Sequence, residues 1–200
     1  TYMQVEGAAR NGGVTVREFG LDESKGWALD IASLDAAITE KTKVIAVVNP
    51  NNPSGKILAE AEMAAIVAAA DKVGAWLIAD EVYGGAERER NDQTPSFFGR
   101  YDKVIAVNGL SKAYGLPGLR LGWAVAPLEI IEALWRRHEF VTISASMLGN
   151  RLGEIALRPD VRPQLISRTR RLIRDGFATL QEMLAVRPSV SSVVAPMASA

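Results

Sequence analysis

Short apolar runs rich in β-branched residues alternate along the chain with longer segments in which apolar residues recur every three to four positions. The short runs are typical of buried strands, and the longer segments are typical of amphipathic helices. Strands that alternate with helices predict an α/β fold with a mainly parallel sheet covered by helices. The predicted strands lie at 14–19, 44–48, 75–79, 103–107 and 121–125, and the predicted helices at 2–11, 31–39, 59–73, 127–138, 144–157 and 161–185.

From Pro127 onward the pattern has the period of helices, and a long helix begins near residue 161, so the boundary of the sheet domain is predicted near 155–165. We therefore expect a sheet domain over 1–158, followed over 159–200 by a linking helix and the start of a C-terminal domain. We expect both ends of the chain to be cut. The chain begins at Thr1 without Met, and its last residues read as if another strand should follow. The arginines of the long helix, at 168, 170, 171 and 174, predict a solvated helix face rather than a nucleic-acid stripe.

Composition narrows the classes of function. The chain has 23 basic and 23 acidic residues, so it exerts no global attraction on nucleic acid or an anionic membrane. It has no cysteine, and no group of residues has metal-ligand spacing, so neither a disulfide framework nor a metal site is expected. No apolar run approaches the roughly 20 residues that span a bilayer. We expect a soluble, cytoplasmic protein. The single histidine, His138, is interpreted as an exposed or interface residue.

Polar residues that can carry chemistry follow three of the predicted strands. They are the turn Asn49–Gly55, Asp80 in Asp80-Glu-Val-Tyr83, and Ser111-Lys112, with Arg120 eight residues later. Because ligands of open α/β sheets bind at the carboxyl ends of the strands, these residues should converge. Three of these groups also have simpler interpretations: a polar turn for Asn49–Gly55, a helix cap for Asp80, and a surface salt bridge for Arg120.

Lys112 lies between a fully apolar run and a Gly-Leu-Pro-Gly turn, a rare place for a lysine that is only solvated. A lysine that forms a Schiff base needs a rigid, partly desolvated position. Asp80 at a strand tip is what a protonated ring nitrogen needs as a partner. The planar guanidinium of Arg120, between apolar neighbours, suits a phosphate.

Three motifs occur together: Asn-Pro-Asn-Asn-Pro-Ser-Gly from 49, Asp-Glu-Val-Tyr from 80, and Ser-Lys-Ala-Tyr-Gly-Leu-Pro-Gly-Leu-Arg-Leu-Gly-Trp from 111. With them, nearly the whole chain resembles the large domain of the class I and II aminotransferases, the fold-type I enzymes that use pyridoxal 5′-phosphate. The resemblance implies that Lys112 forms the Schiff base with the cofactor and moves the proton between substrate and cofactor. It also implies a cis peptide before Pro53.

The resemblance implies roles for the other residues as well. Asp80 would keep the pyridine nitrogen protonated, so that the ring acts as an electron sink. Asn52 and Tyr83 would hydrogen-bond the phenolic oxygen, and Arg120 would hold the phosphate. The complete cofactor-binding set implied is Tyr2, which would stack on the ring, with Asn52, Asp80, Tyr83, Ser111, Lys112 and Arg120. Many relatives carry a phosphate-binding serine where this chain has Gly109.

The expected function is the transfer of an amino group between an amino acid and a 2-oxo acid, by an enzyme that is a homodimer in its full-length form. Two alternatives remain open from the sequence. The same cofactor site serves lyases and decarboxylases, and the fold also occurs as the ligand-sensing domain of transcription regulators. The resemblance places further phosphate contacts before Thr1 and the substrate-carboxylate arginine after Ala200. The 200-residue piece alone is therefore expected to bind cofactor weakly and turn over little.

Overall fold

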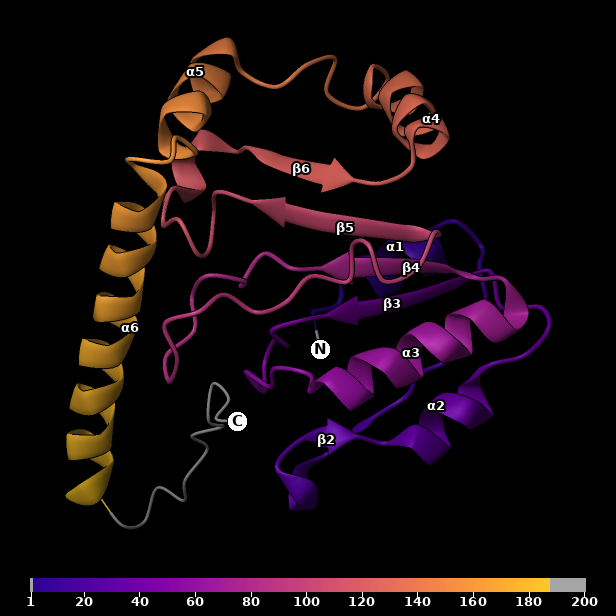
Figure 1. Ribbon diagram of the computed structural model, residues 1–200, viewed down its shortest axis with the longest axis horizontal. Coiled ribbons are helices and arrows are strands. Elements are labelled where there is room, and N and C mark those ends of the chain that lie inside the picture. Colours follow the sequence, from indigo (N-terminus) through magenta and orange to yellow (C-terminus); the bar gives the residue numbers. More distant parts are fainter. Residues whose placement is uncertain (1, 188–200) are drawn as a thin grey trace.

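A four-stranded sheet forms the centre of the computed structural model, which describes residues 2–187 (Figure 1). The strand order is β3-β4-β5-β6, in which β3, β4 and β5 are parallel and β6 is antiparallel to β5. The bounds are Val44–Val48 for β3, Trp76–Asp80 for β4, Val104–Gly109 for β5 and Gly122–Val125 for β6. These strands match the predicted ones to within a few residues, so the predicted α/β class with a mainly parallel sheet is confirmed.

Helix α3 (Glu60–Val73) connects β3 to β4 and covers one face of the sheet. Its apolar stripe of Met63, Ile66, Ala69 and Ala70 is buried against strand residues such as Leu77, which lies in the same core cluster. The helix ends at Gly74, which adopts the left-handed conformation that favours glycine. This crossover brings the carboxyl ends of β3 and β4 to the same edge of the sheet.

The N-terminal part of the chain differs from the prediction. The expected strand at 14–19 is wrong, because these residues form no strand, and the short antiparallel pair lies further on. The side chain of Asp22 accepts a hydrogen bond from the Ser24 backbone, and Gly26 adopts a left-handed φ, so a tight turn brings together residues on either side of it. The elements of this part are α1 (Gln4–Asn11), β1 (Leu21–Asp22), the 3₁₀ turn η1 (Glu23–Lys25), β2 (Ala28–Leu29) and α2 (Ile31–Ala37).

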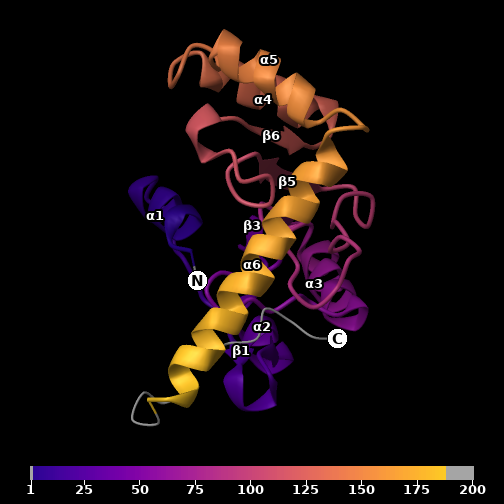
Figure 2. The ribbon, with the colours of Figure 1, turned by 90° about the vertical axis from the view of Figure 1, so that its left-hand side faces the viewer.

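The C-terminal part is helical, with α4 (Leu128–His138), α5 (Met147–Ala156) and α6 (Arg162–Ala185), after the 3₁₀ turn η2 (Pro117–Leu119). In Figure 1 the arrowheads of β3, β4 and β5 point toward α6, and Figure 2 shows α6 crossing in front of the sheet. Helix α6 therefore passes the carboxyl ends of the parallel strands. None of the helices within residues 2–187 has the length and apolar character needed to cross a bilayer.

The arginines of α6 form the solvated face that the sequence predicted only in part, because Arg171 and Arg174 are exposed whereas Arg168 and Arg170 are half-buried. Arg168 donates to the Tyr114 carbonyl (2.9 Å), Arg170 donates to the Glu87 carboxylate, and Arg174 donates to the Arg88 carbonyl (2.7 Å). Arg170 and Arg174 are bonded in this way because the connection after β4, polar in sequence, runs along α6.

Candidate functional site

The polar turns that follow β3, β4 and β5 lie at one edge of the sheet. In the parallel register Val48 is opposite Asp80, and Asp80 is opposite Val107. Asn52 follows the end of β3 at Val48 by four residues, and Lys112 follows the end of β5 at Gly109 by three. The sheet thus places side chains from three separate motifs at the edge where open α/β sheets bind ligands.

A hydrogen bond joins the first two turns. The side-chain amide of Asn52 donates to the Tyr83 hydroxyl at 3.2 Å, and both residues are half-buried. The Asn49–Gly55 turn is held by its own side chains, because Asn49 accepts from the Leu58 N–H (3.0 Å) and Ser54 donates to Asn51 (2.9 Å). The peptide bonds before Pro50 and Pro53 are both cis. The turn therefore directs Asn52 toward Tyr83 instead of forming a simple polar connection.

Asp80 is a half-buried carboxylate at the tip of β4. One oxygen accepts a hydrogen bond from the Val82 N–H at 3.2 Å. Burial raises the pKa of the Asp80 carboxyl above its ordinary value, while the Val82 N–H and the charge of Lys112 oppose that rise. Residues 81–84 form a turn and no helix follows, so Asp80 is not the helix cap that the simpler reading suggested.

Lys112 lies beside Tyr83, with its Nζ atom 5.8 Å from the centroid of the aromatic ring. The backbone that follows is firmly packed, because Ala113 and Tyr114 are buried. The lysine side chain itself is exposed, which differs from the partly desolvated position expected from the sequence. Its rigidity comes from the backbone on its C-terminal side.

Arg120 adopts a left-handed backbone conformation (φ 50°) at the end of η2. Its guanidinium is exposed and donates to the Pro117 carbonyl at 3.1 Å, and it forms no ion pair with a carboxylate within residues 2–187. The surface salt bridge considered from the sequence is therefore not formed in this part of the chain.

The structure does not join three of the predicted site residues to the others. Among residues 2–187 the Arg120 side chain bonds only within its own turn, to Pro117. Ser111 is half-buried next to Lys112, but no side-chain hydrogen bond involves it among the described residues. Tyr2 is 49% exposed and precedes α1, and none of the hydrogen bonds or aromatic contacts of residues 2–187 links it to Lys112 or Asp80.

Gly109 has a structural reason to lack a side chain. A Cβ atom there would lie 3.1 Å from the Leu121 carbonyl oxygen and 3.2 Å from the Gly122 Cα atom. Both neighbours are backbone atoms, at the start of the antiparallel strand β6 and just before it, so they cannot move aside easily. A serine at this position would require this backbone to shift by a few tenths of an ångström.

Sequence reasoning missed two carboxylates. Glu81 accepts hydrogen bonds from the Phe97 N–H (2.8 Å) and the Ser96 hydroxyl (2.9 Å), and so fixes the segment before β5. Burial raises the pKa of Glu81, although these two hydrogen bonds lower it. Glu87 is fully buried in the connection after β4. Neither was signalled, because a Glu in a polar stretch gives no pattern that distinguishes a buried carboxylate from a solvated one.

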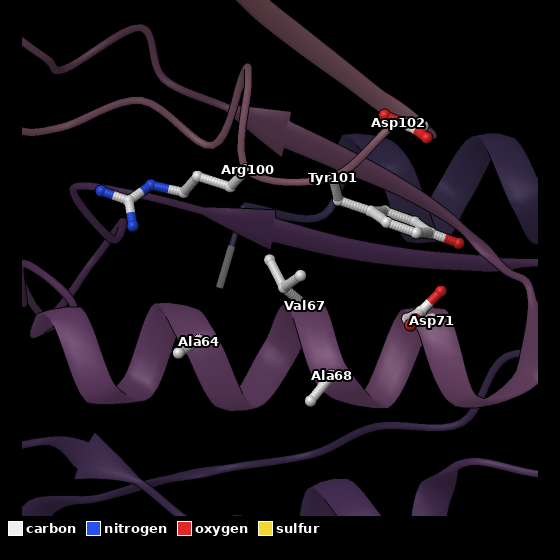
Figure 3. Close-up of a pocket in the computed structure, with 7 residues that line it drawn as sticks. All are labelled: Ala64, Val67, Ala68, Asp71, Arg100, Tyr101 and Asp102. Atoms are coloured by element: carbon white, nitrogen blue, oxygen red, sulfur yellow. The ribbon is translucent and has the colours of Figure 1, made fainter.

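A cavity of about 610 Å³ lies elsewhere, between α3 and the turn that precedes β5 (Figure 3). Val67, Asp71 and Tyr101 line it, and none of the predicted site residues does. Residues 100–102 lead into the amino end of β5, so this cavity is at the opposite edge of the sheet from Asn52 and Asp80. Within residues 2–187 no group of three or more His, Cys, Asp or Glu side chains is placed to hold a metal ion.

Comparison with known proteins decides the family. The model of the family described as aminotransferase class I and II matches residues 1–189, almost the whole chain. The chain belongs to the class I and II aminotransferases.

Individual aminotransferases are similar in sequence and in structure. Nicotianamine aminotransferase A from Hordeum vulgare is 36% identical over 134 residues, 66% of this chain and 29% of that protein. Capreomycidine synthase from Streptomyces vinaceus is 32% identical over 161 residues, 78% of this chain and 40% of that protein. The crystal structure of a PLP-dependent aminotransferase from Streptococcus suis has a TM-score of 0.88 at 31% identity, covering 98% of this chain and 51% of that one. The chain thus spans about half of this solved aminotransferase and less than half of the two sequence relatives.

Proposed function

We propose that the full-length protein is a pyridoxal 5′-phosphate-dependent aminotransferase that transfers an amino group between an amino acid and a 2-oxo acid. Membership of the class I and II aminotransferases supports the activity. The observation that carries the proposal is the placement of Lys112 beside Tyr83 and near Asp80, at the carboxyl edge of the parallel strands. An amine, a phenol and a half-buried carboxylate from separate loops meet there.

The donor and acceptor groups at this edge fit the cofactor. Asp80 has a raised pKa and a single backbone hydrogen bond, so a cationic ring nitrogen would stabilise its charged form. The Asn52 amide and the Tyr83 hydroxyl are donors that suit the phenolic oxygen. Arg120 has no carboxylate partner among the described residues, which leaves its guanidinium available for a phosphate. Ser111 and Tyr2 complete the proposed cofactor-binding set.

In the proposed reaction Lys112 would hold the cofactor and would then act as the base and acid that moves a proton on the substrate. The cofactor, when bound, would supply an electron sink for the charge left on the substrate carbon. Asp80 would keep the ring nitrogen protonated, and Asn52 and Tyr83 would hydrogen-bond the phenolic oxygen. The position of Lys112 is fixed by the buried residues Ala113 and Tyr114 that follow it.

We further propose that the full-length protein is a cytoplasmic homodimer, with the domain boundary near residues 158–159. Large apolar side chains exposed between α4 and α5 support a partner surface. Phe140 is 90% exposed, Val141 79% and Met147 83%. Contiguous exposed apolar residues of this size are typical of interfaces between subunits.

The experiment that tests the function uses the full-length protein loaded with cofactor. We expect Lys112→Ala to abolish the visible absorption band of the lysine-linked cofactor and to lower the rate of amino-group transfer by about 10⁴-fold or more, the scale of losing a covalent catalytic group. Lys41→Ala, at an exposed lysine, is the matched control. An unchanged band and rate in Lys112→Ala, or products other than a new amino acid and a 2-oxo acid, would contradict the proposal.

A further inference from the structure

Glu87 is a buried carboxylate that closes the connection after β4. Its side chain is fully buried. Its Oε1 atom accepts hydrogen bonds from the Gly85 N–H (2.8 Å), the Thr94 N–H (2.7 Å) and the Thr94 hydroxyl (2.8 Å). The carboxylate thus joins Gly85, two residues after Tyr83, to Thr94, ten residues before the start of β5.

The second oxygen of Glu87 is bound by helix α6. Arg170 donates to Glu87 Oε2 and also to the Asp92 carbonyl at 3.1 Å, and its own side chain is only 11% exposed. Burial raises the pKa of the Glu87 carboxyl, but the hydrogen bonds from the Gly85 N–H, from Arg170 and from Thr94 outweigh it and lower that pKa. A buried ion pair is tolerated when hydrogen bonds complete it. Both oxygens of Glu87 are bonded in this way, whereas the buried Nε atom of Arg170 has no hydrogen-bond partner within residues 2–187.

Close packing adds a second contact between α6 and the same connection. Gly85 has a φ of 110°, and a Cβ atom there would lie 2.8 Å from Ile166 Cδ1 and 3.2 Å from Ala113 Cβ. The Ile166 side chain belongs to α6, and Ala113 directly follows Lys112. Three chain segments therefore meet at Gly85 with no spare space, so a displacement of α6 displaces both other segments.

Helix α6 also binds the segment after Lys112 directly. Arg168 donates to the Tyr114 carbonyl (2.9 Å), and Arg162 donates to the Tyr114 hydroxyl (3.0 Å). Beyond the strand ends, the direct backbone link between the Tyr83 and Lys112 segments is a long hydrogen bond, from the Ala113 N–H to the Val82 carbonyl at 3.5 Å. The shorter hydrogen bonds that connect these two segments do so through α6.

We propose that Glu87 and Arg170 are positioning residues, which act through α6 to fix the segment that carries Tyr83 relative to the segment that carries Lys112. The relevance to catalysis rests on the proposed function, because it requires that Tyr83 and Lys112 share one cofactor. Neither positioning residue touches the cofactor. Helix α6 runs on past Arg174 to Ala185.

Hydrogen exchange in the cofactor-free, full-length protein tests the proposal. We expect Glu87→Gln and Arg170→Gln each to speed amide exchange by about tenfold or more in two segments, 81–86 and 110–116. Glu87 contacts only the first of these segments, so faster exchange in the second reports the coupling through α6. Arg171→Gln, at the exposed neighbouring arginine of the same helix, should change neither. Faster exchange confined to 84–95 would overturn the proposal.

A conservative variant separates positioning from general loss of structure. Arg170→Lys retains the charge and one donor to Glu87, so we expect exchange in 110–116 to fall between that of the wild type and that of Arg170→Gln. Should Arg170→Gln fail to fold, Glu87→Gln, which keeps the shape of the side chain, and Arg170→Lys carry the same comparison. Exchange at 110–116 equal to wild type in both of these variants overturns the proposal.

A spectroscopic readout connects the positioning to the cofactor. In the loaded enzyme, we expect Glu87→Gln and Arg170→Lys to change the wavelength or the intensity of the lysine-linked absorption band, because a displaced Tyr83 segment changes the surroundings of the cofactor bound to Lys112. An unchanged band in both folded variants would overturn the link to the site. The exchange measurement needs no cofactor, so it decides the coupling separately from the Lys112 experiment that decides the function.

Discussion

Two carboxylates seven residues apart, one at the end of β4 and one in the connection that follows, have opposite environments. Asp80 is half-buried with one backbone hydrogen bond, and burial raises its pKa. Glu87 is fully buried, yet its hydrogen bonds with Gly85, Thr94 and Arg170 lower its pKa. A carboxylate with an incomplete set of partners gains from binding a cation, whereas one with a complete set already stabilises the fold. The difference distinguishes the residue proposed to serve the cofactor from the residue that holds the site together.

The largest effect is expected when Glu87 loses Arg170, one of its hydrogen-bonding partners. Arg170→Met leaves Glu87 buried without its cation, so the free energy of unfolding should fall by about 3–5 kcal/mol. Urea denaturation of the cofactor-free protein measures this change. Arg171→Met, at the exposed neighbour, should stay within about 0.5 kcal/mol of wild type.

A double variant sharpens the same prediction. Glu87→Leu combined with Arg170→Met removes both charges, and apolar side chains that replace a buried ion pair often restore the stability. We expect the double variant to unfold at a higher urea concentration than Arg170→Met. Equal or lower stability would show that the pair is not the source of the effect.

The next largest effect is expected at Asp80, the carboxylate with one backbone hydrogen bond. In the loaded full-length enzyme Asp80→Asn removes the anionic partner proposed for the ring nitrogen, and the turnover rate should fall by roughly 10²–10³-fold, the scale of losing one electrostatic contact in an active site. Steady-state kinetics with a panel of amino acids measures it. Asp35→Asn, at an exposed helix position, is the control. Wild-type turnover in Asp80→Asn would remove Asp80 from the proposed site.

The two carboxylates also differ in how well the sequence predicts them. Asp80 closes an apolar strand run and begins a four-residue motif, and Lys112 and Asn52 lie in motifs of the same kind, so local pattern places them at one sheet edge. The partners of Glu87 are distant: Arg170 is 83 positions away, and the surrounding Arg-rich stretch is polar. Burial of such a stretch depends on where α6 packs, which no local pattern specifies.

The fold likewise has elements that the local sequence pattern predicts and elements that it does not. The strands 44–48, 75–79, 103–107 and 121–125 have near-continuous apolar runs, and the structure contains all four. The alternation at 14–19 predicted a strand that is absent, because Val14 is 59% exposed and these residues have no strand partner within the described chain. A strand needs a neighbour as well as a pattern. Exposure of Lys112 could not be predicted either, since it depends on which segments cover the edge of the sheet.

A smaller effect is expected from pH at Glu87. Its folded-state pKa is lowered, so its stabilisation is present above the unfolded pKa and is lost as the pH falls through the folded pKa. Glu87→Gln should therefore be less stable than wild type at neutral pH, by about 1.5–3 kcal/mol for hydrogen bonds to a charged group. The difference should vanish in acid. Denaturation of both proteins between neutral and acidic pH measures it, and a constant difference would contradict the assignment.

The smallest effect is expected at Asp80, where a substitution should raise the stability at neutral pH instead of lowering it. The folded-state pKa of Asp80 is raised, so the folded protein binds this proton more tightly than the unfolded chain does, and stability falls as the pH rises from the unfolded to the folded pKa. Asp80→Asn removes that cost and keeps an oxygen for the Val82 N–H. The cofactor-free variant should therefore be slightly more stable than wild type at neutral pH, by under about 1 kcal/mol after solvent screening. The gain should disappear in acid. A variant less stable than wild type at neutral pH would mean that the Asp80 carboxylate, like that of Glu87, already has its partners in the fold.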